Sequence, residues 1–170
     1  VCPKGGEFTR FAPVEDLPGI APPRGANAKD PQKFHETTIT CKRSATLVPY
    51  DHVEFIGSAV AKTENAGVIE GESLLIRLLP DDSGSRKAGQ IAGIAVVGMA
   101  HVHYGDFEGF ADRIELDPSN EWVTLLGEGG RDARISTRDM SDHSSLIHYN
   151  RRTGDFNTGP FEMTRRPEKK

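Results

Sequence analysis

Apolar and polar residues alternate along most of the chain after about residue 37. A period of two is typical of strands that bury one face and expose the other. Turn-forming sequences such as Asp81-Asp82-Ser83-Gly84 separate the runs, and no segment has a convincing helical period. The alternating runs are residues 53–61, 73–79, 91–104, 112–116, 122–126, 131–135, 145–149 and 161–164. We therefore predict an all-β body of about eight to ten strands.

Three stretches of this body share one sequence phrase, in which alternating apolar residues lead to a glycine and then a small residue. The glycines of the three phrases are Gly57, Gly98 and Gly127, and a second strand-like run follows each of them. Repeats that each expose an apolar face must stack to bury it. The phrase therefore favours a β-solenoid or an open jellyroll, and an ordinary β-sandwich is the alternative.

The same segments resemble a known family. Residues 111–117, 122–127 and 132–135, and then 145–150, are similar to the OstA repeat of the LptA family. The resemblance covers about residues 50–166 and is strongest over 91–136. Three features depart from the family pattern, namely the histidines of the second repeat, the proline-rich N-terminal arm and the long insert around Pro80–Gly89.

The resemblance implies an open β-jellyroll, a bent stack of short antiparallel strands. Proteins of this family conduct lipopolysaccharide through the periplasm, with acyl chains in an apolar groove, and they perform no covalent chemistry. They also join other subunits edge to edge through unpaired terminal strands. The resemblance thus implies a periplasmic or otherwise exported protein, possible membrane association, a lipid ligand similar to lipopolysaccharide, and partners that pair through β-edges.

The alternation also identifies the residues that would line such a groove. Burial of a lipid tail among aliphatic side chains contributes about 0.8 kcal/mol per CH₂ group. Alternation does not distinguish a groove from a filled core, so plain core packing is the other interpretation. The candidate lipid-binding residues are Val53, Phe55, Leu74, Ile76, Ile94, Val96, Ile114, Leu116, Val123, Leu125, Ile135 and Ile147.

The N-terminal region differs in composition from the body. Six of the eleven prolines lie within the first 31 residues. Because proline fixes φ and lacks an N–H donor, we expect residues 1–36 to form an extended, irregular arm or linker. The predicted organisation is this arm, a β-domain over 37–166 and a charged tail over 167–170. An arm that docks on a partner gives a second hypothesis, a structural scaffold subunit of a larger, membrane-associated complex.

Composition and charge exclude several classes of protein. The net charge of −4 argues against nucleic-acid binding through phosphate electrostatics. No apolar run reaches the roughly 18–20 residues of a membrane span. Two cysteines, Cys2 and Cys41, are too few for a disulfide framework; they form one bridge in an exported protein or remain two thiols. The chain begins at Val1 rather than methionine, so we expect a processed product.

One group of residues indicates possible metal chemistry. His101 and His103 lie two apart, on one face of the expected strand, and Asp106 follows just beyond. Such residues are able to bind a metal ion, with His143 or His148 joining from the next repeat, although solvated surface histidines fit the same pattern. No nucleophile elbow or phosphate-binding loop is present. We predict a non-enzymatic protein without a cofactor; a metal-dependent enzyme built on a small β-barrel is the third hypothesis.

Overall fold

A computed structural model of the protein describes residues 6–13, 34–63, 67–79, 91–117, 121–159 and 163–164. These residues form one antiparallel sheet of thirteen strands, more than the eight to ten that we expected. The described ranges contain no helix, and hence no helix that could span a membrane. The all-β prediction is confirmed.

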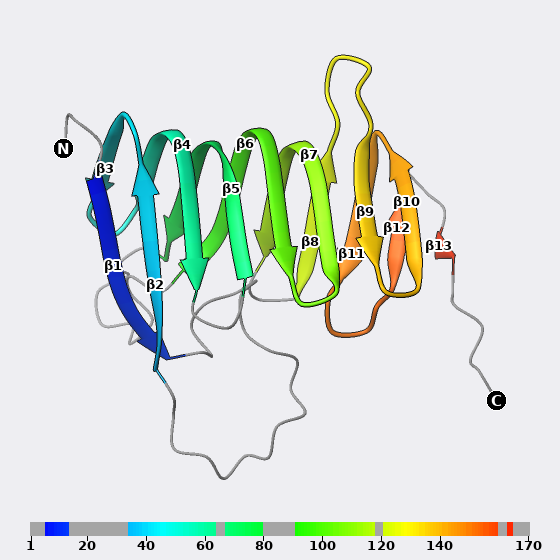
Figure 1. The fold of residues 1–170 in the computed structure, drawn as a ribbon, viewed down its shortest axis with the longest axis horizontal. Helices are drawn as coiled ribbons and strands as arrows, with labels where there is room; N and C mark the ends of the chain where they lie inside the picture. The colour runs from blue at the N-terminus through cyan, green and yellow to red at the C-terminus, as the bar shows by residue number, and fades with distance from the viewer. Residues whose placement is uncertain are drawn as a thin grey trace, which may run out of the picture.

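Strand order in the sheet follows the chain closely (Figure 1). The main path runs β1-β2-β4-β5-β6-β7-β8-β11-β12-β13, while β3 pairs with β4, and β9 pairs with both β7 and β10. The strands are β1 (Gly6–Pro13), β2 (Phe34–Cys41), β3 (Ser44–Val48), β4 (His52–Thr63), β5 (Gly67–Leu78), β6 (Ile91–Tyr104), β7 (Phe107–Asp117), β8 (Trp122–Leu126), β9 (Ala133–Thr137), β10 (Met140–Ser144), β11 (Leu146–Asn150), β12 (Phe156–Thr158) and β13 (Met163–Thr164).

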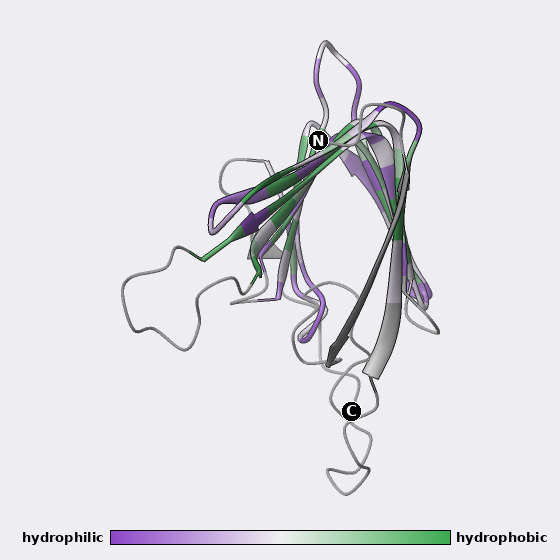
Figure 2. Cartoon of the chain, turned by 90° about the vertical axis from the view of Figure 1, so that its left-hand side faces the viewer, coloured by the Kyte–Doolittle hydropathy of each residue, from purple (hydrophilic) through white to green (hydrophobic). Residues whose placement is uncertain are grey.

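The four longest strands bend halfway along their length. The register between β4 and β5 shifts between Ile56 and Ala59, and that between β6 and β7 shifts between Val97 and Ala100. Each bent strand contributes to two layers. The first half of β4 pairs with β3 and its second half with β2, while β7 pairs with β9 before its bend and with β8 after it. One continuous sheet thus folds into two facing layers, which form a V in Figure 2.

Two of the three glycines of the repeated phrase lie at these bends. Gly57 and Gly98 have φ values of +87° and +81°, and the residues that follow them, Ser58 and Met99, are also left-handed. Glycine tolerates this conformation without steric cost. Gly127 has a different role, because a Cβ atom there would collide with the backbone of Arg131. The repeated phrase therefore marks the bend at its first two occurrences, as the open-jellyroll prediction requires.

Part of the expected arm is a strand. β1 pairs with β2 along its whole length, which differs from the irregular conformation that we expected for these residues. β1 is the terminal strand of the sheet order, and such an edge tolerates a proline such as Pro13. Residues 14–33 and the insert at 80–89 lie outside the described residues. The division into arm, body and tail therefore stays a prediction.

Candidate functional site: the apolar interior

The inner faces of the two layers meet in one apolar cluster. The cluster joins residues from β2 through β11, and nine of its side chains come from outside the twelve predicted positions. Ten of the twelve predicted groove residues are buried in it, and the other two, Val53 and Ile76, are half-buried and pack against it. The structure therefore brings all the predicted lining residues together.

Register arranges the interior into rows that cross the strands. In the layer that contains β8 and β11, one row is Ala45, Phe55, Leu74, Val96, Ile114, Leu125 and Ile147. A parallel row in the same layer is Leu47, Val53, Ile76, Ile94, Leu116, Val123 and Tyr149. Both rows consist mostly of large side chains, so this layer presents a nearly continuous aliphatic surface to the interior.

The facing layer presents smaller side chains. Its central row is Ile39, Ala61, Ile69, Val102, Gly109 and Ile135. Ala59, Ala100 and Ala133 are also buried in this layer. Of these residues only Ile135 was among the predicted lining residues. The unbroken alternation of β4 and β6 would have found Ala61 and Val102, whereas Ile69 requires the alternation of β5 to be followed separately on each side of the bend.

The interior is bridged at the side opposite the bends. There the hairpin between β6 and β7 faces Glu121, just before β8, and the turn after β11 in the other layer. The rings of Phe107 and Tyr149 stack at a centroid distance of 4.9 Å. The guanidinium of Arg151 lies 5.7 Å from the centre of the Tyr104 ring and forms an ion pair with Glu121. We call these five residues the clasp.

The guanidinium at the centre of the clasp is poorly hydrated, whereas its partner Glu121 is partly exposed. The side chain of Arg151 is only 10% exposed. Burial raises the pKa of Tyr104 above its usual value, and Glu121 acts in the same direction, whereas the positive charge of Arg151 opposes the shift. An ion pair and a cation–π contact are both stronger where water is largely excluded. The clasp is therefore a specific polar and aromatic tie between the two layers.

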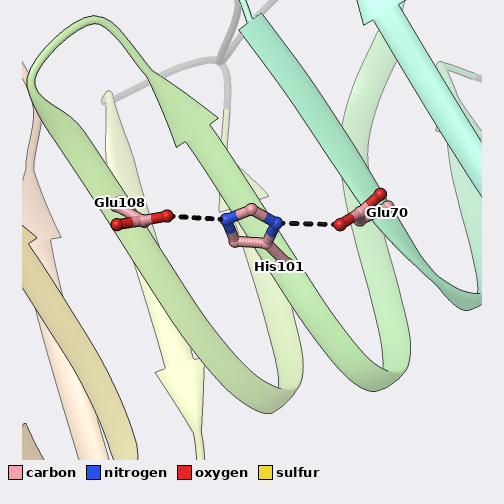
Figure 3. A network of polar contacts seen from close by, with 3 residues as sticks. All are labelled: Glu70, His101 and Glu108. Carbon is pink, nitrogen blue, oxygen red and sulfur yellow. Dashed lines mark hydrogen bonds and ion pairs between the residues drawn. The ribbon is translucent and has the colours of Figure 1, made fainter.

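The predicted metal site is not assembled. Nδ1 of His101 lies 2.9 Å from Glu70, and its Nε2 lies 3.3 Å from Glu108, so the imidazole bridges β5, β6 and β7 (Figure 3). Asp106 instead forms an ion pair with Arg138, and His103 is exposed on the outer face. In the part of the chain that the structure describes, no three side chains form a metal-binding group. Strand alternation correctly placed both histidines on one face, but hairpin geometry directs Asp106 to a different partner.

The remaining histidines of that prediction are also separate from the pair. Nδ1 of His148 lies 3.0 Å from the hydroxyl of Thr124 on the neighbouring strand β8, in the other layer. His143 is exposed on β10, at the far side of β9. The ring of His101 stacks on that of Phe110 instead, with a centroid distance of 4.3 Å. These contacts tie outer-face side chains of neighbouring strands to one another.

Comparison with known proteins supports the fold. A crystal structure of LptH, described as the LptA-homologous periplasmic component of the lipopolysaccharide transport device of Pseudomonas aeruginosa, is similar with a TM-score of 0.56. The match covers 77% of this chain and 95% of that chain, at 15% sequence identity. This chain thus has an LptA-like open β-jellyroll fold. No protein-family model and no curated protein matches the sequence.

Proposed function

We propose that this chain is a non-enzymatic, exported protein that binds the acyl chains of a lipid similar to lipopolysaccharide between its two layers. A single observation carries the proposal: an open sheet of LptA-like fold encloses an interior that is apolar along most of the strand order. LptH, which has this fold, belongs to a lipopolysaccharide transport device.

The chemistry of the interior suits acyl chains. Rows of aliphatic side chains run across the strands, so a ligand lying along the roll meets one apolar residue after another. Transfer of a 12-carbon chain from water into such surroundings has a gross value of roughly 10 kcal/mol. Half-buried Val53 and Ile76 border the interior and are the accessible lining residues at which a ligand chain would first make contact.

The ends of the sheet suit a bridging role. Within the described residues, β3 pairs with β4 alone and β10 with β9 alone, so each has an unpaired edge. Such an edge is able to bind a further strand. Leu47 and Tyr50, in and just after β3, are 61% and 55% exposed. We include in the proposal that this chain joins neighbouring subunits through its end strands.

Site-specific photo-crosslinking tests the lipid-binding proposal. A photoreactive phenylalanine analogue replaces Ile76 on the inner face or, as the matched control, its exposed neighbour Arg77. Val53 and Glu54 form a second such pair on the neighbouring strand. With purified lipopolysaccharide as the probe, we expect adducts at Ile76 and Val53 and few at Arg77 and Glu54. Equal labelling of both faces, or none, would contradict the proposal.

The bridging role has its own test. Sedimentation velocity measures self-association, or association with a candidate subunit, for the unmodified chain and for Leu47→Lys. A charge on an exposed edge strand disfavours pairing, so we expect weaker association in this variant. Val97→Lys, at an exposed position of β6 in the middle of the sheet order, is the control. Unchanged association in Leu47→Lys would show that the β3 edge is not the joining surface.

A further inference from the structure

The two layers have one covalently continuous border and one border made of separate segments. The continuous border contains the bends, with Gly57 and Gly98 among them. The other border consists of strand ends and turns from both layers, which we call the mouth. In the C-terminal half of the roll, the hairpin of residues 104–107 and the turn after β11 approach each other across the mouth. The clasp is the set of contacts that joins them.

The clasp contacts that join the two layers do not follow from strand pairing. Phe107 pairs in register with Tyr104 across its own hairpin, and Tyr149 pairs with Val123 in the other layer. The stack between Phe107 and Tyr149 therefore links the layers through side chains alone. The same is true of Arg151 and Tyr104. Side-chain contacts of this kind are able to break while both layers keep their backbone hydrogen bonds.

We propose that the clasp is a gate at the mouth, which keeps the two layers together and controls the entry of an acyl chain into the C-terminal half of the interior. This inference rests on the proposed function, because it names the route by which a ligand reaches the same interior. The rings of Phe107 and Tyr149 pack against the apolar cluster and cover it from the mouth. A chain that enters sideways at this level has to separate them.

Arg151 is the central residue of the gate. Its side chain contacts Tyr104 in one layer and Glu121 in its own, and its backbone N–H donates to the carbonyl oxygen of Glu121. Substitution of the side chain leaves this backbone hydrogen bond in place. Arg151→Met keeps much of the length and apolar character of the stem but removes the charge. The neighbouring Arg152 is exposed and supplies the matched control, Arg152→Met.

The first measurement uses no lipid. Spin labels at exposed His103 and Asp155 lie in opposite layers beside the mouth, and Cys2→Ser leaves only the buried Cys41 as a native thiol. Electron–electron double resonance then gives the distance distribution across the mouth. We expect one narrow distribution in the unmodified chain and in Arg152→Met, and a longer or broader one in Arg151→Met. An unchanged distribution in Arg151→Met would overturn the gate.

The second measurement follows entry of a ligand. Stopped-flow fluorescence gives the rates at which cis-parinaric acid, an 18-carbon fluorescent fatty acid, binds and leaves. We expect Arg151→Met to raise both rates about tenfold, because it removes the cation–π contact and the ion pair of a largely buried guanidinium. Tyr104→Phe keeps the ring beneath the guanidinium and should leave both rates close to those of the unmodified chain. Equal rates in all variants would overturn the gate.

One further variant and one further outcome separate a failure of the gate from a failure of the proposed function. Glu121→Gln removes the ion pair but keeps the ring contacts, and it replaces Arg151→Met if that variant folds poorly. We expect it to raise the rates of binding and release by a smaller factor. If the fatty acid does not bind to the unmodified chain, the proposed function and the entry role both fail. The lipid-free distances would in that case still decide whether the clasp holds the layers together.

Discussion

The inner and outer faces of this sheet have opposite chemistry, although the same strands carry both. On β8, Val123 and Leu125 face the interior and are completely buried, whereas Thr124 between them faces outward and contacts His148. The outer face ties its polar side chains to one another, as Glu70, His101 and Glu108 do. The described buried residues are apolar apart from Thr37 and Asn150. We therefore expect the ligand-binding residues on the inner face. We also expect substitutions on that face to lower the free energy of unfolding the most.

The largest expected effect comes from truncation of the inner face. Leu125→Ala removes a fully buried side chain and leaves a cavity, so we expect the free energy of unfolding to fall by about 2–5 kcal/mol. Leu126→Ala makes the same chemical change on the outer face of the same strand and should cost less than about 1 kcal/mol. Urea denaturation followed by circular dichroism measures both. Equal losses would mean that the two faces do not differ in packing.

A substitution at the bend between the layers should lower the free energy of unfolding less than truncation of the inner face does. Gly98 has φ of +81°, and a Cβ atom there would lie 2.7 Å from the Cβ of Glu72. We expect Gly98→Val to lower the free energy of unfolding by about 1–3 kcal/mol through strain and overpacking. Gly93→Val, in the same strand but away from the bend between the layers, meets only ordinary contacts and is the control. A loss within about 0.5 kcal/mol at Gly98 would refute its assigned role at the bend.

The clasp predicts a pH dependence. The pKa of Tyr104 is raised by burial, so the folded chain keeps this proton to higher pH than the unfolded chain does. The associated stability is present below about pH 10 and is lost as the pH rises through the raised pKa of the folded state. Tyr104→Phe should therefore make the alkaline loss of stability less steep, whereas Tyr50→Phe should not. Parallel alkaline denaturation curves for Tyr104→Phe and the unmodified chain would contradict this prediction.

The smallest change in the free energy of unfolding is expected from a substitution on the outer face. A neutral imidazole donates from only one nitrogen, so His101 makes hydrogen bonds to both carboxylates only when it is protonated. His101→Gln should change the free energy of unfolding by less than about 1 kcal/mol, because these partners are partly hydrated. Elemental analysis of the purified protein measures bound metal and provides a second readout. Stoichiometric metal that is lost in His103→Ala would revive the hypothesis of a metal site.

The two layers also show which interior residues can be predicted from sequence alternation. Eleven of the twelve predicted lining residues belong to the layer that contains β8 and β11, and Ile135 is the exception. In β5 the buried residues change from odd to even positions, from Ile69 to Leu74, and β7 makes the same change from Gly109 to Ile114. The bulges at the bends cause this change. In β4 and β6 the buried positions keep one parity through the bend, as from Phe55 to Ala61. A single alternation followed through a whole strand therefore assigns both layers in β4 and β6 but only one layer in β5 and β7.

Contacts made by loops and turns were beyond prediction for a different reason. Asp106 and Arg138 lie in separate hairpin turns, and the clasp depends on how closely two layers approach. Neither the direction of a turn nor the spacing of layers leaves a periodic signal in the sequence. The strands, the bends and one inner face were predictable because each has a local pattern. The clasp and the partners of the histidines required the fold.

Native mass spectrometry of the chain, isolated under mild conditions from cells that export it and make lipopolysaccharide, tests the central claim most directly. We predict a protein peak carrying a lipid mass, which is released on activation in the gas phase. The sample with Leu125→Ala should carry less lipid, while that with Leu126→Ala should be unchanged. Isolation of the chain without lipid, and only within a multi-subunit complex, would contradict the account and favour a structural subunit.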